Sequence, residues 1–247
     1  MSRLKWDRNK DRSYETGVDR GVLFVCDDSG NYGHGVAWNG LTSVAEKSSG
    51  GEPTPFWADN VKYLNLLSAE SFGATIEAYS FPRAFRSCLG RRNIADGVTV
   101  TQQKRQSFGF SFRSFVGNQE RGNDWSYKIH IIYGCLASPS EKANNTVNDS
   151  PEIATLSWEV STLPIQVNGF KPTSEFILDG PRYKKLGLMN VLRAIEDYLY
   201  GTADTQSALP TLDQITEIYT YQRYLRDSDG DILLDSQGRP MSSFVPN

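Results

Sequence analysis

The amino-acid sequence predicts a mainly β protein of packed antiparallel sheets with one flanking α-helix. Two observations carry this prediction. Several segments alternate apolar and polar residues with a period of two, which is typical of strands with one buried and one wet face. A later segment repeats its apolar residues at helical spacing. The chain has 247 residues, 38% of them hydrophobic, which is enough for one large β domain or two small ones.

The strand signals come first along the chain. A continuous apolar run over 21–26 ends in a turn signal, and 61–67 alternates in part. Cleaner alternation follows over residues 72–80, 107–115, 127–135 and 156–162. Polar segments over 117–124 and 137–151 are expected to connect strands as loops. The side chains expected to form the core under the helix are Phe108, Phe110, Phe112, Ile129, Ile131 and Trp158.

The clearest helix is expected over 184–200. Leu188, Leu192 and Ile195 fall on one stripe, and Gly201 suits the position just after a helix end. Weaker signals indicate a helical turn over 81–89, a helix over 212–221 and a hairpin over 227–241. The expected organisation is an N-terminal arm (1–20), a β domain (21–210) with a long loop over 39–60, and a C-terminal extension (211–247).

Composition excludes several classes of function. The net charge of −3 lacks the excess of basic residues that is typical of proteins that bind nucleic acid. Cys26, Cys88 and Cys135 are far apart and odd in number, so we expect buried free thiols rather than a disulfide framework. With only two histidines we expect no dedicated metal site and no cofactor. The N-terminal residues lack the apolar core of a secretory signal, and no apolar run is long enough to span a bilayer, so we expect cytoplasmic assembly and no membrane contact.

No catalytic constellation follows from the motifs, so we expect no enzyme. Residues 117–122 have the glycine spacing of a phosphate loop, but the required lysine does not follow. Asp227, Asp229 and Asp231 alternate as in calcium loops, yet the glycine and the final glutamate that such loops need are out of place. A solvated turn is the simpler interpretation of the aspartates, and the sequence leaves cation binding there open.

A series of short strings, in order along the chain, resembles the major tail tube proteins of long-tailed (siphovirus) bacteriophages. The strings are YETGVDRGVL (14–23), WNGLT (38–42), ADNVKY (58–63), ATIEAY (74–79), FGFSFR (108–113), YKIH (127–130), YG (133–134), PSE (139–141), LSW (156–158), KPT (171–173) and LYGT (199–202). Each string alone is weak, but their collinear order from about Trp6 to Pro210 is specific. From Asp213 onward the chain departs from the family pattern.

The resemblance implies a structural virion protein without catalytic residues. It implies a fold of two packed β-sheets with a flanking helix, and hexameric rings whose inner sheets join into one continuous barrel. The implied partners are other copies of the chain, the tape measure protein in the lumen during assembly, and the tail terminator and distal tail proteins at the ends. Double-stranded DNA would pass through without specific binding, in a virion tail assembled in the host cytoplasm.

Simple geometry agrees with a conduit. If six subunits each give four strands, the barrel is about 48 Å across, and side chains leave a bore of about 38 Å. Duplex DNA is roughly 20 Å wide, which leaves a gap close to the Debye length of about 8 Å. Six subunits of charge −3 carry −18 per ring, which favours passage of DNA through the bore over binding of DNA to its wall. The polar strand faces supply the expected lumen residues, namely Thr75, Glu77, Ser107, Ser111, Lys128, His130, Ser157 and Glu159.

Contacts between rings are expected from the charged N-terminal arm and from the loop over 39–59. Their aromatic residues Trp6, Tyr14, Phe56 and Trp57 are of the kind that anchors protein interfaces. Flexible surface is the simpler interpretation of both segments.

Two alternatives remain open at this point. A β-sandwich module that binds carbohydrate or a receptor, or that decorates a virion, would explain the aromatic residues and predicts a cluster of exposed Trp and Tyr. A hydrolase would need a pocket with perturbed carboxyl groups, for example Glu77 with Glu159.

Overall fold

The computed structural model describes residues 12–140 and 153–224 without a break. It also describes the single positions Leu4, Trp6, Arg8, Asn9, Lys142, Asn144, Thr146, Ile232, Leu233 and Met241. The hairpin predicted over 227–241 lies almost wholly outside the described residues, as do Asp227, Asp229 and Asp231.

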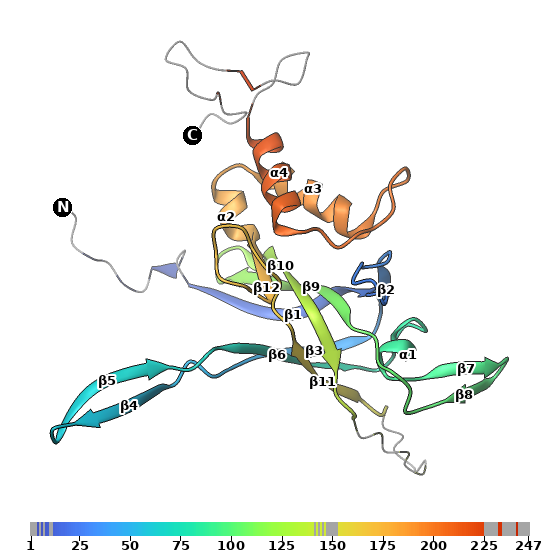
Figure 1. The fold of residues 1–247 in the computed structure, drawn as a ribbon. Helices are drawn as coiled ribbons and strands as arrows, with labels where there is room; N and C mark the ends of the chain where they lie inside the picture. Colours follow the sequence, from blue (N-terminus) through green and yellow to red (C-terminus); the bar gives the residue numbers. More distant parts are fainter. Residues whose placement is uncertain are drawn as a thin grey trace.

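In the described part of the chain, eight strands form one antiparallel sheet in the order β2-β1-β9-β10-β11-β6-β3, with β12 paired to β10 (Figure 1). The strands are β1 (Ser13–Val25), β2 (Val36–Trp38), β3 (Leu41–Ser49), β6 (Ser71–Ala78), β9 (Phe108–Asn118), β10 (Gly122–Ala137), β11 (Leu156–Thr162) and β12 (Glu175–Asp179). The predicted mainly β class is confirmed. The predicted separation into two sheets is not seen, because the long strand β10 pairs with β9 and β12 and then, at its end, with β11.

This sheet curves around a first hydrophobic core, which we call the inner core. The inner core draws side chains from both ends of the strand order and from the short helix α1 (Phe85–Cys88), which confirms the helical turn predicted over 81–89. Its main members are Leu23, Trp38, Ile76, Phe85, Phe108, Phe110, Phe112, Ile132, Trp158 and Val160. Both halves of the sheet are therefore held by one set of aromatic and aliphatic contacts.

A second core, the helix-side core, lies between the opposite face of the sheet and three helices. The helices are α2 (Gly180–Lys185), α3 (Met189–Tyr200) and α4 (Leu212–Arg223), which gather on one side of the sheet in Figure 1. The main members of the helix-side core are Phe24, Ile129, Ile131, Tyr133, Val191, Leu192, Ile195 and Leu199.

The predicted core under the helix is therefore split. Ile129 and Ile131 do lie under the helices, but Phe108, Phe110 and Phe112 of β9 and Trp158 point into the inner core. Residues 108–112 of β9 and 129–133 of β10 are buried on both faces of the sheet, and in β9 the residues between the phenylalanines, Gly109 and Ser111, are small. A Cβ at Gly109 would lie 2.3 Å from the Cδ2 atom of Leu209, so only glycine lets that leucine pack against the strand.

The single helix predicted over 184–200 is two helices. Gly187 lies between α2 and α3 and has a φ of +70°, a conformation that favours glycine and ends the helical path. Asp179 begins α2 by accepting a hydrogen bond from the backbone N–H of Arg182. The weaker helix predicted over 212–221 is confirmed as α4, which begins with a capping box between Thr211 and Gln214.

The segment predicted as a long loop over 39–60 is mostly strand. Strand β3 pairs with β6 along its length, and β4 (Pro53–Ala58) pairs with β5 (Val61–Leu67) as a hairpin that projects from the body (Figure 1). Asp59 and Asn60, with φ values of +50° and +64°, form the tight turn of that hairpin. A smaller hairpin joins β7 (Arg92–Ala95) to β8 (Val98–Val100).

The boundary predicted at residue 20 for the N-terminal arm also needs correction. Residues 13–20 belong to β1, which pairs with β9 from Ser13 onward. Cys26, Cys88 and Cys135 are buried free thiols, as predicted. None of the helices in the described ranges has the length and apolar composition that crossing a bilayer requires.

Candidate functional site

Four of the eight predicted lumen residues share one wet surface on β6 and β11. Glu77 pairs with Ser157, and Thr75 pairs with Glu159, so all four side chains point away from the inner core. The residues that alternate with them, including Ile76 and Trp158, are buried in that core. For these two strands the predicted face assignment agrees with the structure.

The wet face continues onto the flanking strands. On β3, Ser43 pairs with Glu77, Ala45 with Thr75, and Lys47 with Gly73. At the end of β10, Leu136 pairs with Ser161 of β11. The four strands β3, β6, β11 and the end of β10 thus present one continuous outer surface, which we call the wet face.

Strand β3 forms an edge of the sheet. It pairs with β6 on one side, and within the described residues no strand pairs with its other side. An edge strand offers unpaired backbone N–H and C=O groups to another chain. The wet face therefore ends in an edge strand, whose first residue Leu41 lies against Gly21 of β1.

The other four predicted lumen residues do not lie on the wet face. Ser107 is half-buried just before β9, and Ser111 is 1% exposed and pairs with Ile131 on the helix side of the sheet. Lys128 forms an ion pair with Glu15 of β1, and His130 is buried. The prediction was wrong for Ser111 and His130 because both faces of β9 and β10 are buried at these positions.

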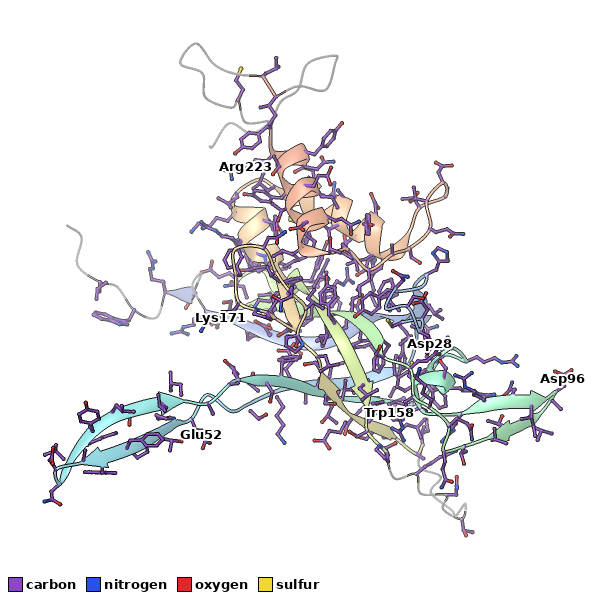
Figure 2. The ribbon with its side chains drawn as sticks, viewed as in Figure 1. Asp28, Glu52, Asp96, Trp158, Lys171 and Arg223 are labelled. Atoms are coloured by element: carbon purple, nitrogen blue, oxygen red, sulfur yellow. The ribbon has the colours of Figure 1, made fainter. Side chains whose placement is uncertain are left out.

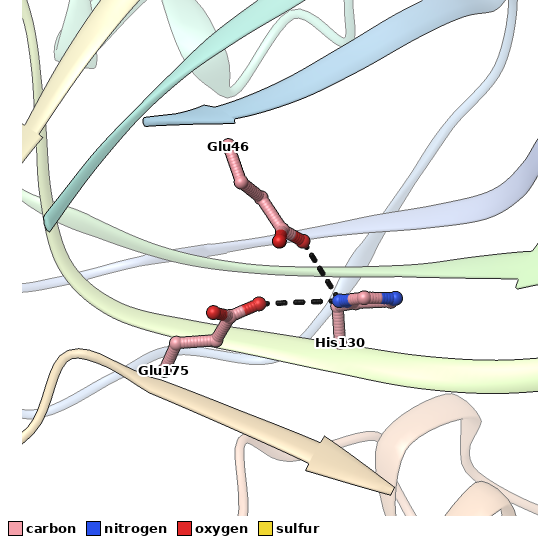
Figure 3. A group of neighbouring side chains, drawn as sticks. All are labelled: Glu46, His130 and Glu175. Carbon is pink, nitrogen blue, oxygen red and sulfur yellow. Dashed lines mark hydrogen bonds and ion pairs between the residues drawn. The ribbon is translucent and has the colours of Figure 1, made fainter. Parts of the chain in front are cut away.

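His130 lies between two carboxylates (Figure 3). Its Nδ1 atom is 2.8 Å from an Oε1 atom of Glu46 on β3 and 3.1 Å from Oε1 of Glu175 on β12. The Nε2 atom is 3.1 Å from the Oγ atom of Ser114, and the ring stacks on Phe112 with centroids 4.5 Å apart. The cluster joins three strands, including the edge strand.

The carboxylates keep the imidazole protonated. Burial lowers the pKa of His130, but the hydrogen bonds from Nδ1 to Glu175 and Glu46 and the charges of both groups outweigh it and raise the pKa to about 9. Burial, together with the charge of Glu46, raises the pKa of the Glu175 carboxyl. The hydrogen bond with His130 lowers the pKa of the Glu46 carboxyl.

We therefore expect a pH-dependent loss of stability at alkaline pH. Because the folded-state pKa lies above the ordinary value of 6.5, the stabilisation is complete below pH 6.5 and is lost as pH rises through about 9. The expected loss is about 1–3 kcal/mol, since one pKa unit corresponds to about 1.4 kcal/mol. Urea unfolding of the wild type and of His130→Gln between pH 6 and 10 measures it. Parallel pH profiles for the two proteins would contradict the proposed charge on the ring.

Arg113 of β9 is paired with acidic side chains of β1 and α3. Its guanidinium donates hydrogen bonds to both carboxylate oxygens of Asp19, at 2.8 and 2.6 Å. It also lies 3.8 Å from Glu196 of α3. These contacts hold the helix-side layer on β1 and β9, so Arg113 has a structural role and takes no part in the wet face.

The β4–β5 hairpin is exposed on both faces. Phe56, Trp57, Leu64 and Leu66 are 47%, 67%, 39% and 56% exposed. Phe56 pairs with Leu64 and Thr54 with Leu66, so apolar side chains gather on one face of the ribbon. Figure 2 shows side chains standing out on both sides of this hairpin. An isolated two-stranded hairpin is marginally stable in water, and exposed apolar patches mark interaction sites.

The remaining predicted contact residues differ in their surroundings. Trp6 is 73% exposed. Tyr14 lies on β1, where its hydroxyl donates a hydrogen bond to Asn123 and its ring covers Gly117. Phe56 and Trp57 are thus the predicted aromatic anchors that the structure places together on a projecting element.

Comparison with known proteins adds no assignment. No protein-family model matches the chain, and no curated protein sequence is significantly similar to it. Glu46 and Glu175 are the site residues that sequence reasoning missed. A histidine between two isoleucines in a strand indicates buried partners, but their identity depends on strand pairing.

Proposed function

We propose that this protein is the subunit of a phage tail tube, which polymerises as stacked hexameric rings around a bore for double-stranded DNA. The observation that supports the proposal best is the wet face, a four-stranded polar surface backed by a hydrophobic core and bounded by the unpaired edge of β3. A sheet of this kind forms a closed wall when copies pair edge to edge, and closure removes the exposed edges.

The projecting hairpin supplies the second supporting feature. A neighbouring subunit or ring that covers Phe56, Trp57 and Leu64 would remove their apolar surface from water. Aromatic side chains at the centre of a contact contribute most of the binding free energy in many interfaces. The hairpin is thus the element that we assign to contacts between subunits.

The side chains of the wet face suit a passage. Thr75 and Ser157 are uncharged, Glu77 and Glu159 are acidic, and Lys47 of β3 is the one basic residue on the β3, β6 and β11 positions described above. Phosphates are repelled by carboxylates and held by lysine and arginine through counterion release. A surface of this composition gives DNA little to bind.

Reversing these charges should make the tube bind DNA. We expect tubes of Glu77→Lys/Glu159→Lys to bind double-stranded DNA at low salt and to release it steeply as salt rises, because added lysines release counterions from phosphate. Co-sedimentation of DNA with assembled tubes measures this, with Glu77→Gln/Glu159→Gln as the neutral control. Equal DNA binding by the lysine and glutamine variants would show that these residues face away from the bore.

Negative-stain electron microscopy of the concentrated, purified full chain tests the proposal directly. Rings or tubes, together with a hexamer or larger species in light scattering, support it. Dispersed monomers or trimers at all concentrations would overturn it and favour the carbohydrate- or receptor-binding module. Such a module presents its aromatic residues on one platform, whereas Phe56 and Trp57 are consecutive residues of β4 and so point to opposite faces of the ribbon.

A further inference from the structure

Three ligand-type side chains from three strands converge beside the edge of the sheet. We propose that Glu46, His130 and Glu175 form a binding site for one divalent metal ion of the zinc type. Their nearest ligand atoms all lie within 4.8 Å of one another (Figure 3). The site is independent of the proposed tube, because its residues all belong to one chain.

The two distances from the imidazole nitrogen to the carboxylates are close to those between the ligands of a tetrahedral ion. Zinc binds nitrogen and carboxylate oxygen at about 2.0–2.2 Å, so ligand atoms around it lie about 3.3 Å apart. In the structure Nδ1 of His130 is 2.8 Å from Glu46 and 3.1 Å from Glu175. Opening these distances by a few tenths of an ångström admits the ion, and glutamate side chains make such a movement without a change in the strands.

The imidazole is oriented for metal binding before any ion arrives. Ser114 holds Nε2 at 3.1 Å, and Phe112 stacks on the ring at an interplanar angle of 6°. Metal-binding histidines commonly use their second nitrogen in this way, which fixes the ring and the tautomer. Nδ1 of His130 is thus left to face the two carboxylates.

The charges around the cluster favour a cation. Glu46, Glu175 and Glu15 bring three carboxylates to the cluster, and Lys128 is paired with Glu15. A divalent ion that takes the place of any proton on Nδ1 of His130, with that proton released to solvent, balances the three carboxylates together with Lys128. The ion also separates Glu46 from Glu175, whose mutual repulsion costs free energy when they are brought together.

Access and ligand chemistry point to the same class of ion. A groove of about 500 Å³ between β1 and β3 is lined by Glu46, His130 and Ser114, which gives the ion a path and a water as fourth ligand. Imidazole with carboxylates suits zinc, cobalt or nickel, whereas calcium and magnesium prefer oxygen-only sets. The bound ion would tie the edge strand β3 to β10 and β12.

Calorimetry on the chelator-stripped full chain tests the proposal, with zinc chloride as titrant at pH 7.5. We expect one ion per chain with micromolar or tighter affinity. His130→Asn and Glu175→Gln should each weaken binding at least about 10–100-fold, since even supporting residues of metal sites have effects of this size. Cobalt(II) should give the visible absorption of a tetrahedral complex in the wild type and lose it in both variants.

The chain offers matched controls for each substitution. His34 is the other histidine and is exposed, so His34→Asn should bind zinc as the wild type does, and so should Glu159→Gln. Circular dichroism checks that each variant is folded, and Glu46→Gln replaces Glu175→Gln if the latter does not fold. Absence of binding to the wild type, or loss of binding in the His34 variant alone, would overturn the proposal.

Discussion

Replacing Phe85 by alanine should lower the free energy of unfolding by about 3–5 kcal/mol. Phe85 is fully buried on the short helix α1. Its ring lies 4.5 Å from that of Trp38 and 5.3 Å from those of Phe108 and Trp158, measured between centroids. These partners come from both halves of the curved sheet, so the cavity left by alanine would loosen the contact that holds the halves together.

Urea unfolding followed by tryptophan fluorescence measures the effect of Phe85→Ala. Phe170→Ala is the matched control, because Phe170 is 77% exposed and its loss should change stability by less than about 0.5 kcal/mol. A loss below about 1 kcal/mol for Phe85→Ala would mean that α1 does not pack in the inner core. It would also mean that the strands of the wet face do not pack on α1.

Local sequence pattern was enough to predict the strands whose two faces differ in polarity. In β11, Trp158 and Val160 alternate with Ser157 and Glu159, and the structure places one set in the core and the other on the wet face. In β9 the alternation is between phenylalanine and small residues. The pattern predicts that Ser111 faces water. In the structure it is covered by helices that come from a later part of the chain.

Strand β3 and the first strand of the hairpin, β4, fall within the predicted loop, whereas the partial alternation over 61–67 did indicate the second strand of the hairpin, β5. Strand β3 reads LTSVAEKSS, and it is extended because it pairs with β6, some thirty residues away. Such pairing is a tertiary effect that a local pattern does not contain. The pair of glycines before β4, together with Pro53 and Pro55, is typical of a loop.

The cluster around His130 depended on tertiary structure even more strongly. Glu46 reaches His130 only because the curvature of the sheet brings β3 close to β10, although the two strands are not neighbours in the strand order. Glu175 reaches it because β12 pairs with β10, and neither pairing has a local signature. Sequence alone could indicate that a histidine in such a strand needs partners, and nothing more.

Replacing Phe56 and Trp57 together by serine should raise the protein concentration needed for tube assembly at least about 100-fold. Aromatic anchors at the centre of an interface each contribute about 2 kcal/mol or more, so losing two corresponds to roughly a 1000-fold weaker contact if their effects add. Both side chains are exposed in the isolated subunit, so the fold itself should keep its stability.

Sedimentation of tubes across a concentration series measures the effect, and circular dichroism confirms an unchanged fold. Phe56→Leu/Trp57→Phe is the matched control, because it keeps an apolar side chain at both positions, one on each face of the hairpin. Assembly of this control within a few-fold of the wild type would show that burial of apolar surface drives the contact. If instead the serine variant assembles as readily as the wild type, the hairpin takes no part in joining subunits, and the unpaired edge of β3 must carry the contact alone.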